Sequence, residues 1–176
     1  IGARGLTMTK WNPDHERPEM WVLGSVGDTF AEFNCGGLAV VCGVEAKNPD
    51  NVLGYRPCVG MVGGKIYFRG STDGSYSTTN AKLTRPDDAE WQWLVERLPE
   101  FLERIGRRKL LATLSERAEW QVLTAITPQE RALMFAGPMP MAEFRRRIWD
   151  KGFGGGDPLR DLAPGLERDL VGVVES

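Results

Sequence analysis

Two blocks of this chain share one pattern, in which paired glycines are followed by a short run of strand-forming residues and a closing glycine. The first block spans residues 36–43 and reads Gly-Gly-Leu-Ala-Val-Val-Cys-Gly. The second begins 27 residues later, spans residues 63–70 and reads Gly-Gly-Lys-Ile-Tyr-Phe-Arg-Gly. A weaker copy at residues 20–24 closes 19 residues before the first block closes. A short strand repeated at this spacing, with glycine at each corner, predicts a coiled β-solenoid of two or three coils.

The side chains of these blocks alternate as strands require. Counted back from the closing glycines Gly24, Gly43 and Gly70, the positions two and four residues earlier are all apolar. Because successive side chains on a strand point to opposite faces, we expect these six to point inward and stack in a column. The intervening positions are mixed in character and are expected to point outward, Cys42 among them. The inward set is Met20, Val22, Ala39, Val41, Ile66 and Phe68.

A coil of this kind needs glycines at its corners, where a positive φ or the close approach of two coils excludes other residues. The paired and closing glycines of the blocks are therefore expected to mark the bends of the coil. The expected corner residues are Gly24, Gly27, Gly36, Gly37, Gly43, Gly60, Gly63, Gly64 and Gly70.

The chain changes character near Arg85-Pro86. Of its 21 glycines, 13 precede this point, whereas Leu, Glu, Arg and Trp at helical spacing follow it. The first apolar stripe recurs in steps of three and four up to Gly106, which is expected to end the helix, and Pro99 is expected to kink or break it. We therefore predict a β domain over residues 1–84 and a helical segment over residues 85–176.

Further helices are expected in this segment. One covers residues 109–125, where apolar residues again recur in steps of three and four. Another begins at the capping box Thr127-Pro128-Gln129-Glu130 and ends at Met134 or Phe135. A third follows Pro140, and the tail carries a weak fourth.

Three residues are candidate contacts with a protein partner. Asn48 and Asp50 lie in a polar insertion, residues 44–52, and insertions in solenoids often form a contact face. An ordinary solvated loop is the alternative. Trp93 lies off the apolar stripe of its helix, so that it either anchors a partner or adds to the core.

Composition excludes several classes of function. The chain has 176 residues, a net charge of −2 and 26% charged residues, so no basic excess points to nucleic acid. No apolar run reaches the roughly 18 residues of a membrane span. The irregular spacing of Cys35, Cys42 and Cys58 fits buried thiols in a reducing, cytoplasmic setting better than a metal site or disulfides. The start at Ile1 has no signal-peptide character, and we expect the chain to come from a longer protein.

No catalytic motif accompanies this architecture. The Gly24-Ser25-Val26-Gly27 pattern does not fit a dinucleotide loop, because no helix follows it. The single histidine, His15, lies in a Pro-bounded polar loop, and the chain has no nucleophile elbow. Asp28 and Glu32 either bind a substrate cation or bond turn backbone. We therefore expect no catalytic, cofactor-binding or metal-binding residue in this chain.

Part of the chain resembles a known family. Residues 26–28 (Val-Gly-Asp), 31–33 (Ala-Glu-Phe), 36–43 and 60–70 resemble, in order, the C-terminal GXGXG domain of the glutamate synthase large subunit and the similar domain found in formylmethanofuran dehydrogenases. The resemblance covers roughly residues 20 to 70. It implies a right-handed parallel β-helix without catalytic residues.

The resemblance also implies a function. The chain would be a structural or interaction part of a glutamate-synthase-like oxidoreductase, with FMN, an iron–sulfur cluster and the glutaminase on partner subunits. One alternative is the corresponding scaffold in a formylmethanofuran dehydrogenase or formyltransferase/hydrolase complex, and a second is a stand-alone hydrolase. Protein partners, a possible homo-oligomer and a cytoplasmic location are expected, with neither nucleic acid nor membrane as partner.

Overall fold

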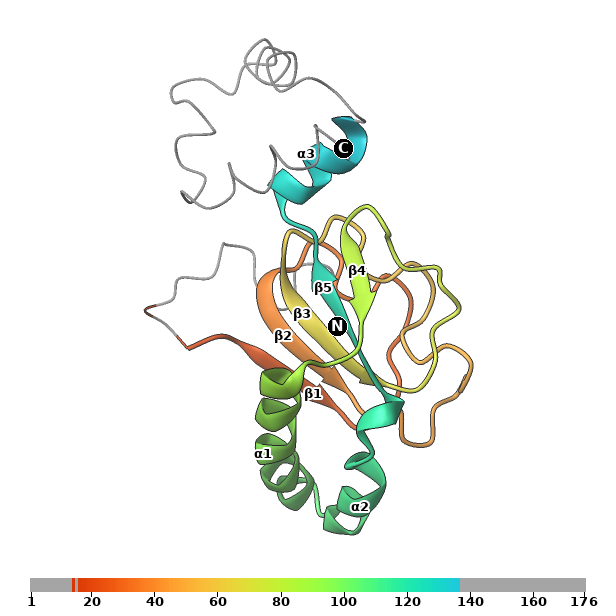
Figure 1. Ribbon diagram of the computed structural model, residues 1–176. Coiled ribbons are helices and arrows are strands. Elements are labelled where there is room, and N and C mark those ends of the chain that lie inside the picture. Colours follow the sequence, from red (N-terminus) through yellow and green to blue (C-terminus); the bar gives the residue numbers. More distant parts are fainter. Residues whose placement is uncertain (1–13, 15, 137–176) are drawn as a thin grey trace. The chain divides into compact units, whose positions relative to one another are not determined.

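The computed structural model describes residue 14 and residues 16–136. By its internal contacts the chain forms two compact units, residues 1–131 and 132–176, and the second is described only at the end of one helix. The first unit contains an open five-stranded sheet (Figure 1). Its strands are β1 (Glu19–Val22), β2 (Cys35–Val41), β3 (Gly63–Arg69), β4 (Ala81–Thr84) and β5 (Trp120–Ala125).

The sheet is mixed, with the order β1-β2-β3-β5-β4. Strands β1, β2 and β3 run parallel, and β5 lies antiparallel to both β3 and β4. The helical elements are short apart from one. They are α1 (Asp88–Arg104), the 3₁₀ turn η1 (Arg108–Leu110), α2 (Leu111–Leu114), the 3₁₀ turn η2 (Arg117–Glu119) and α3 (Pro128–Ala136).

Each face of the sheet buries its own core. The helix-side core lies between the sheet and α1, with Leu94, Leu98 and Leu102 of α1 fully buried against Val40 and Trp120. These leucines are four residues apart, so they lie on one stripe of the helix. The connection-side core lies on the opposite face, beneath the segments that join the parallel strands. It contains Phe30, Ala39, Val41, Val52, Leu53, Cys58, Met61, Ile66, Phe68, Ala81, Leu123 and Ala125.

The connections between parallel strands are irregular but are bonded to one another through the main chain. The N–H groups of Thr29 and Phe33, in the first connection, donate to the carbonyls of Tyr55 and Val59 in the second, at 2.8 and 2.9 Å. This arrangement satisfies backbone groups that lie over a buried core. Several of the bonded segments adopt positive φ at residues other than glycine, namely Thr29, Ala31, Phe33, Arg56 and Cys58.

Glycines permit the closest of these approaches. At Gly64, with φ +88°, an added Cβ would overlap the carbonyl oxygen of Gly37. Gly43, Gly60 and Gly70 also have positive φ, and Gly63 lies against the backbone of Cys35. Gly36 and Gly37 are buried in β2, whereas a Cβ at Gly24 or Gly27 would meet nothing nearer than 3.5 Å. Gly54, which the repeat did not indicate, has φ +74° and lies against the backbone of Gly27.

The predicted right-handed β-helix is wrong. The structure has an open mixed sheet in which β3 pairs on its far side with the antiparallel strand β5, and α1 packs on one face. The reason is that inward-facing alternation describes any parallel strand whose face is buried. Five of the six predicted inward residues do share one face, since Met20, Ala39, Val41, Ile66 and Phe68 all belong to the connection-side core or pack against it.

The predicted helix over residues 109–125 is also wrong. Only Leu111–Leu114 is α-helical there, and Trp120–Ala125 forms β5 in the middle of the sheet. The sheet thus joins residues from both sides of the predicted boundary at residue 85. Pro99, which was expected to kink or break the helix, does not break it, since α1 continues through it to Arg104.

Two helix ends are confirmed. The backbone N–H groups of Gly106 and Arg107 donate to the carbonyls of Glu103 and Leu102, which closes the end of α1 where glycine was expected. The capping box at Thr127 starts α3. The helices expected after Pro140 and in the tail lie outside the described residues.

Candidate functional site

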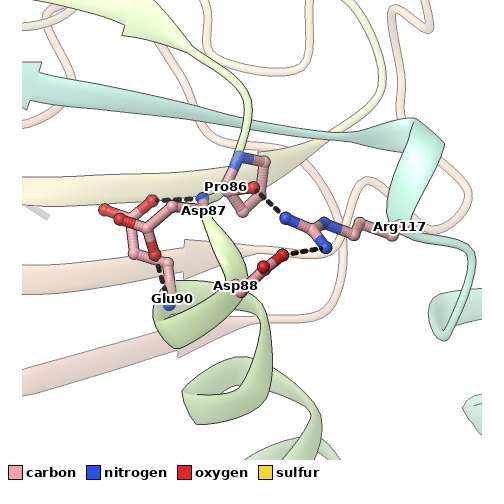
Figure 2. Close-up of polar contacts among 5 residues, drawn as sticks. All are labelled: Pro86, Asp87, Asp88, Glu90 and Arg117. Atoms are coloured by element: carbon pink, nitrogen blue, oxygen red, sulfur yellow. Dashed lines mark hydrogen bonds and ion pairs between the residues drawn. The ribbon is translucent and has the colours of Figure 1, made fainter.

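The start of α1 is fixed by two sets of polar contacts, which Figure 2 shows. Asp87 accepts a hydrogen bond from the backbone N–H of Glu90 at 2.8 Å, and Glu90 accepts one from the backbone N–H of Asp87 at 2.9 Å. Arg117, from η2, donates to the carboxylate of Asp88 and to the carbonyl of Pro86. Because these contacts set the position and rotation of α1, they also set where its side chains meet the sheet.

Four aromatic rings meet where α1 crosses the first strands. Trp93 of α1 stacks on Tyr67 of β3 with ring centroids 5.2 Å apart, and Trp21 of β1 lies 5.9 Å from Trp93. Trp21 also contacts the ring of Phe101 at 5.2 Å. All but Tyr67 are half-buried, so this cluster reaches the surface. Aromatic pairs at such distances add about 0.5–1.5 kcal/mol each beyond their burial.

A groove of about 740 Å³ opens beside this cluster. Its lining includes the apolar side chains of Leu38 in β2 and Trp93 in α1. The remaining lining residues are charged or lie just before β1: Glu16, Arg17, Pro18, Glu19 and Arg97.

Arg97 is one of the charged residues that line this groove. Its guanidinium lies 4.9 Å from the ring centroid of Trp93, a cation–π contact. Its Nε lies 3.4 Å from the carboxylate of Glu19, which also accepts a hydrogen bond from the indole N–H of Trp21 at 3.1 Å. The side chain of Arg97 is 44% exposed, so its ion pair with Glu19 is open to solvent.

Buried titratable groups near the two cores are held in their neutral forms. Burial raises the pKa of Cys42, on the helix side, to about 12, although nearby Arg69 opposes the shift. Burial likewise raises the pKa of Cys58, on the connection side, to about 12. The pKa of Tyr67 is raised by burial first and then by the carboxylates of Glu90 and Asp87. Thiols in this state are poor nucleophiles and poor metal ligands.

The structure does not bring the three predicted partner contacts together. Trp93 lies in the aromatic cluster on the helix side of the sheet. Asn48 and Asp50 are exposed in the β2–β3 connection, where the side chain of Asn48 accepts a hydrogen bond from the backbone of Asp50 at 3.1 Å. No hydrogen bond or ring contact among the described residues joins this turn to Trp93.

The other sequence candidates have local roles or lie outside the description. The carboxylate of Asp28 accepts a hydrogen bond from the backbone N–H of Tyr55 at 2.8 Å, which ties the first connection to the second. Glu32 is half-buried in the first connection. His15 lies outside the described residues. Cys42 was expected to face outward. Its side chain belongs to the helix-side core, not the connection-side core, and it is fully buried.

Sequence reasoning missed the groove. Arg97 and Glu19 are ordinary charged residues in the sequence, and their pairing depends on how α1 crosses β1. The sequence indicated that β1 and β2 lie parallel, but it did not indicate that α1 packs over Trp21. The one available signal was Trp93, whose place off the apolar stripe indicated an additional contact surface.

The comparisons with family models and with curated proteins found no match for this chain. Within the described residues, no group of three or more His, Cys, Asp or Glu side chains is arranged to hold a metal ion. Over the same part of the chain, no helix combines the length and apolar character needed to cross a membrane.

Proposed function

We propose that this chain is a non-catalytic interaction domain of a glutamate-synthase-like oxidoreductase, working in the cytoplasm through protein contacts. FMN, an iron–sulfur cluster and the glutaminase would belong to partner subunits. The proposal rests on the glycine repeat and its resemblance to the GXGXG domain.

One observation carries the proposal. The glycines that give the resemblance are used to bring backbones together, since a Cβ at Gly43, Gly63 or Gly64 would overlap a carbonyl of another segment. In the described residues these segments enclose an apolar core rather than a reactive cavity. A repeat used for backbone packing supports a scaffold, and the half-buried aromatic cluster with its groove supplies a surface for a partner.

The test is to tag the full-length parent protein in its native host, purify it gently and identify its partners by mass spectrometry. Recovery of a glutaminase or an FMN-containing synthase component is the expected result. An amidohydrolase together with a molybdopterin subunit would move the chain to one-carbon chemistry and overturn the proposal. Recovery of the protein alone would overturn it as well.

A matched pair of variants on α1 tests whether the partner binds at the aromatic cluster. Trp93→Ala removes the aromatic anchor and is expected to lower partner recovery about tenfold or more, the loss typical of a central interface residue. Gln92→Ala changes the neighbouring exposed residue and is expected to leave recovery unchanged. Thermal melts of both variants separate lost contact from lost folding, because Trp93 also stacks on Tyr67.

A further inference from the structure

The segment before β4, residues 71–80, is hydrogen-bonded to the connection between β2 and β3. The N–H of Val52 donates to the carbonyl of Ser71 at 3.0 Å, and the N–H of Arg56 donates to the hydroxyl of Ser75 at 3.1 Å. Both bonds satisfy main-chain donors of the connection, and both depend on the length of main chain that separates the two serines. A change in that length would prevent the two bonds from forming together.

A reactive dipeptide lies between these two bonds. Asp73-Gly74 is the only place in the sequence where Asp or Asn precedes Gly. Both residues are exposed, and Gly74 has φ +78° with no atom within 4 Å of the position that a Cβ would take. Because glycine carries no side chain that crowds its own nitrogen, this nitrogen can approach the carboxyl carbon of the residue before it.

The reaction open to such a pair is isomerisation of the aspartate. The main-chain nitrogen of Gly74 attacks the side-chain carboxyl carbon of Asp73, a C–N bond closes a succinimide ring, and the amide proton leaves with the carboxyl hydroxyl as water. Water then adds to a ring carbonyl and breaks a C–N bond. When the bond to the original main-chain carbonyl breaks, the product is isoaspartate, whose main chain contains an additional methylene. No oxidant or reductant is consumed.

The native turn opposes the first step of this reaction. The N–H of Ser75 donates to the carboxylate of Asp73 at 2.9 Å. Hydrogen bonds from the hydroxyl of Ser75 and then from its N–H lower the pKa of Asp73, and the side chain of Asn51 adds to the effect. Ring closure requires the neutral carboxyl, because an ionised carboxylate is a poor electrophile. These hydrogen bonds therefore slow a reaction that the sequence favours.

We propose that Asp73 is a site of spontaneous isomerisation, that Ser75 slows the reaction in the native turn, and that conversion to isoaspartate releases residues 71–80 from the β2–β3 connection. The additional methylene lies between the bonds at Ser71 and Ser75, so that only one of the two can keep its native geometry. This modification is independent of the proposed function, because it needs only water and the chain itself.

Prolonged incubation of the purified chain at neutral pH tests the site. Digested samples are analysed for a peptide of unchanged mass and altered retention that contains residue 73. Isoaspartate in that peptide is confirmed by methyl transfer from S-adenosylmethionine with an isoaspartyl methyltransferase. Product at Asp73 is expected in both native and denatured protein, with slower formation in the native protein. Equal rates, product in denaturant alone, or no product at this residue would overturn the proposal.

Three variants test the chemistry and the role of the turn. Ser75→Ala removes a hydrogen bond to the carboxylate and is expected to raise the native rate about threefold or more, without changing the rate in denaturant. Thr78→Ala removes an exposed hydroxyl from the same segment and is expected to leave both rates unchanged. Asp73→Glu is expected to give no product, because ring closure is unfavourable for the longer side chain. A native rate unaffected by Ser75→Ala would overturn the role of Ser75.

Hydrogen exchange of the converted protein, separated by chromatography, tests the release of the segment. Faster exchange is expected at the N–H groups that join the segment to the connection, those of Val52, Arg56 and Ser77. The N–H groups of Thr29 and Phe33, which join the β1–β2 connection to the β2–β3 connection, are the internal controls. Unchanged exchange at all five groups, or equal acceleration at all five, would overturn a local release.

Discussion

The two faces of the sheet are covered by different means. On the helix side, α1 buries regularly spaced leucines, and the stabilisation comes from side chains that fill space. On the connection side, irregular segments lie over the core and are bonded to one another through their main chains, with positive φ at several positions. The comparison indicates that the helix side is sensitive to side-chain volume and the connection side to backbone conformation.

The largest expected effect is on thiol reactivity, because each face holds one buried cysteine. A pKa of about 12 for Cys42 and for Cys58, against an ordinary value of 9.0, lowers the thiolate fraction about a thousandfold at neutral pH. In the native protein only the half-buried Cys35 should react readily with an aromatic disulfide reagent, and all three should react in denaturant.

Measuring the labelling of each cysteine by peptide mapping at increasing denaturant concentrations tests which face of the sheet opens first. Labelling of Cys58 before Cys42 would show that the connection side opens first, and simultaneous labelling would show one cooperative unit. Rapid labelling of Cys42 without denaturant would contradict the burial described for the helix side.

The next effect is expected from Gly64→Ala on the connection side. The new Cβ would overlap the carbonyl of Gly37 at a backbone conformation that L-residues rarely adopt, so the free energy of unfolding should fall by about 4 kcal/mol or more. Gly74→Ala is the matched control, because Gly74 also has positive φ but has no atom within 4 Å of the Cβ position. Its loss should be about 1 kcal/mol. Equal losses in urea melts would remove the argument for close packing.

On the helix side, Leu98→Ala is expected to lower the free energy of unfolding by about 3 kcal/mol, through lost burial and the cavity left behind. Glu96→Ala, on the exposed part of α1, should change it by less than about 0.5 kcal/mol. Leu98→Met should recover most of the loss, since volume is nearly conserved. If Leu98→Met is as damaging as Leu98→Ala, side-chain volume is not what the helix side requires.

The smallest effect is expected at Glu130, where α3 begins. The hydrogen bond from Lys82, followed by that from the backbone N–H of Thr127, lowers its pKa from 4.5 to about 2. The ionised carboxylate therefore stabilises the fold fully above pH 4.5, and this contribution is lost as the pH falls toward 2. Because the side chain is 44% exposed, solvent screening keeps the contribution below about 1 kcal/mol.

Urea melts of Glu130→Gln and the unaltered protein across this pH range measure the effect. The difference between the two should be present at neutral pH and shrink as acid protonates Glu130. Glu103→Gln serves as control, because Glu103 and its partner Arg108 are both about two-thirds exposed. A difference at Glu130 that persists unchanged in acid would show that the carboxylate's charge is not its source.

Sequence reasoning succeeded where structure is set locally. The alternation of Ala39 and Val41 correctly assigned them to one face, and the capping box at Thr127 correctly placed the start of α3. Both depend on residues a few positions apart. The end of α1 near Gly106 follows for the same reason.

The sequence-based predictions failed where contacts between distant segments of the chain determine the structure. Both faces of β5 are buried, with Trp120 on the helix side and Leu123 on the connection side, so its sequence lacks the apolar–polar alternation of a half-exposed strand. Because β5 was not recognised as a strand, the repeated parallel strands indicated further coils. The predicted architecture was therefore a solenoid instead of a mixed sheet. The groove was missed because Arg97 and Glu19 meet only once α1 has packed on the sheet.

The place of β5 between β3 and β4 determines when the sheet can be completed during synthesis of the chain. Residues 120–125 leave the ribosome well after the strands on either side of them. Until they arrive, the edge of β3 remains unpaired, with Ile66 and Phe68 near an open main chain. A nascent chain that stops short of residue 120 holds an incomplete sheet, and its vulnerability to aggregation ends when the late strand closes that gap.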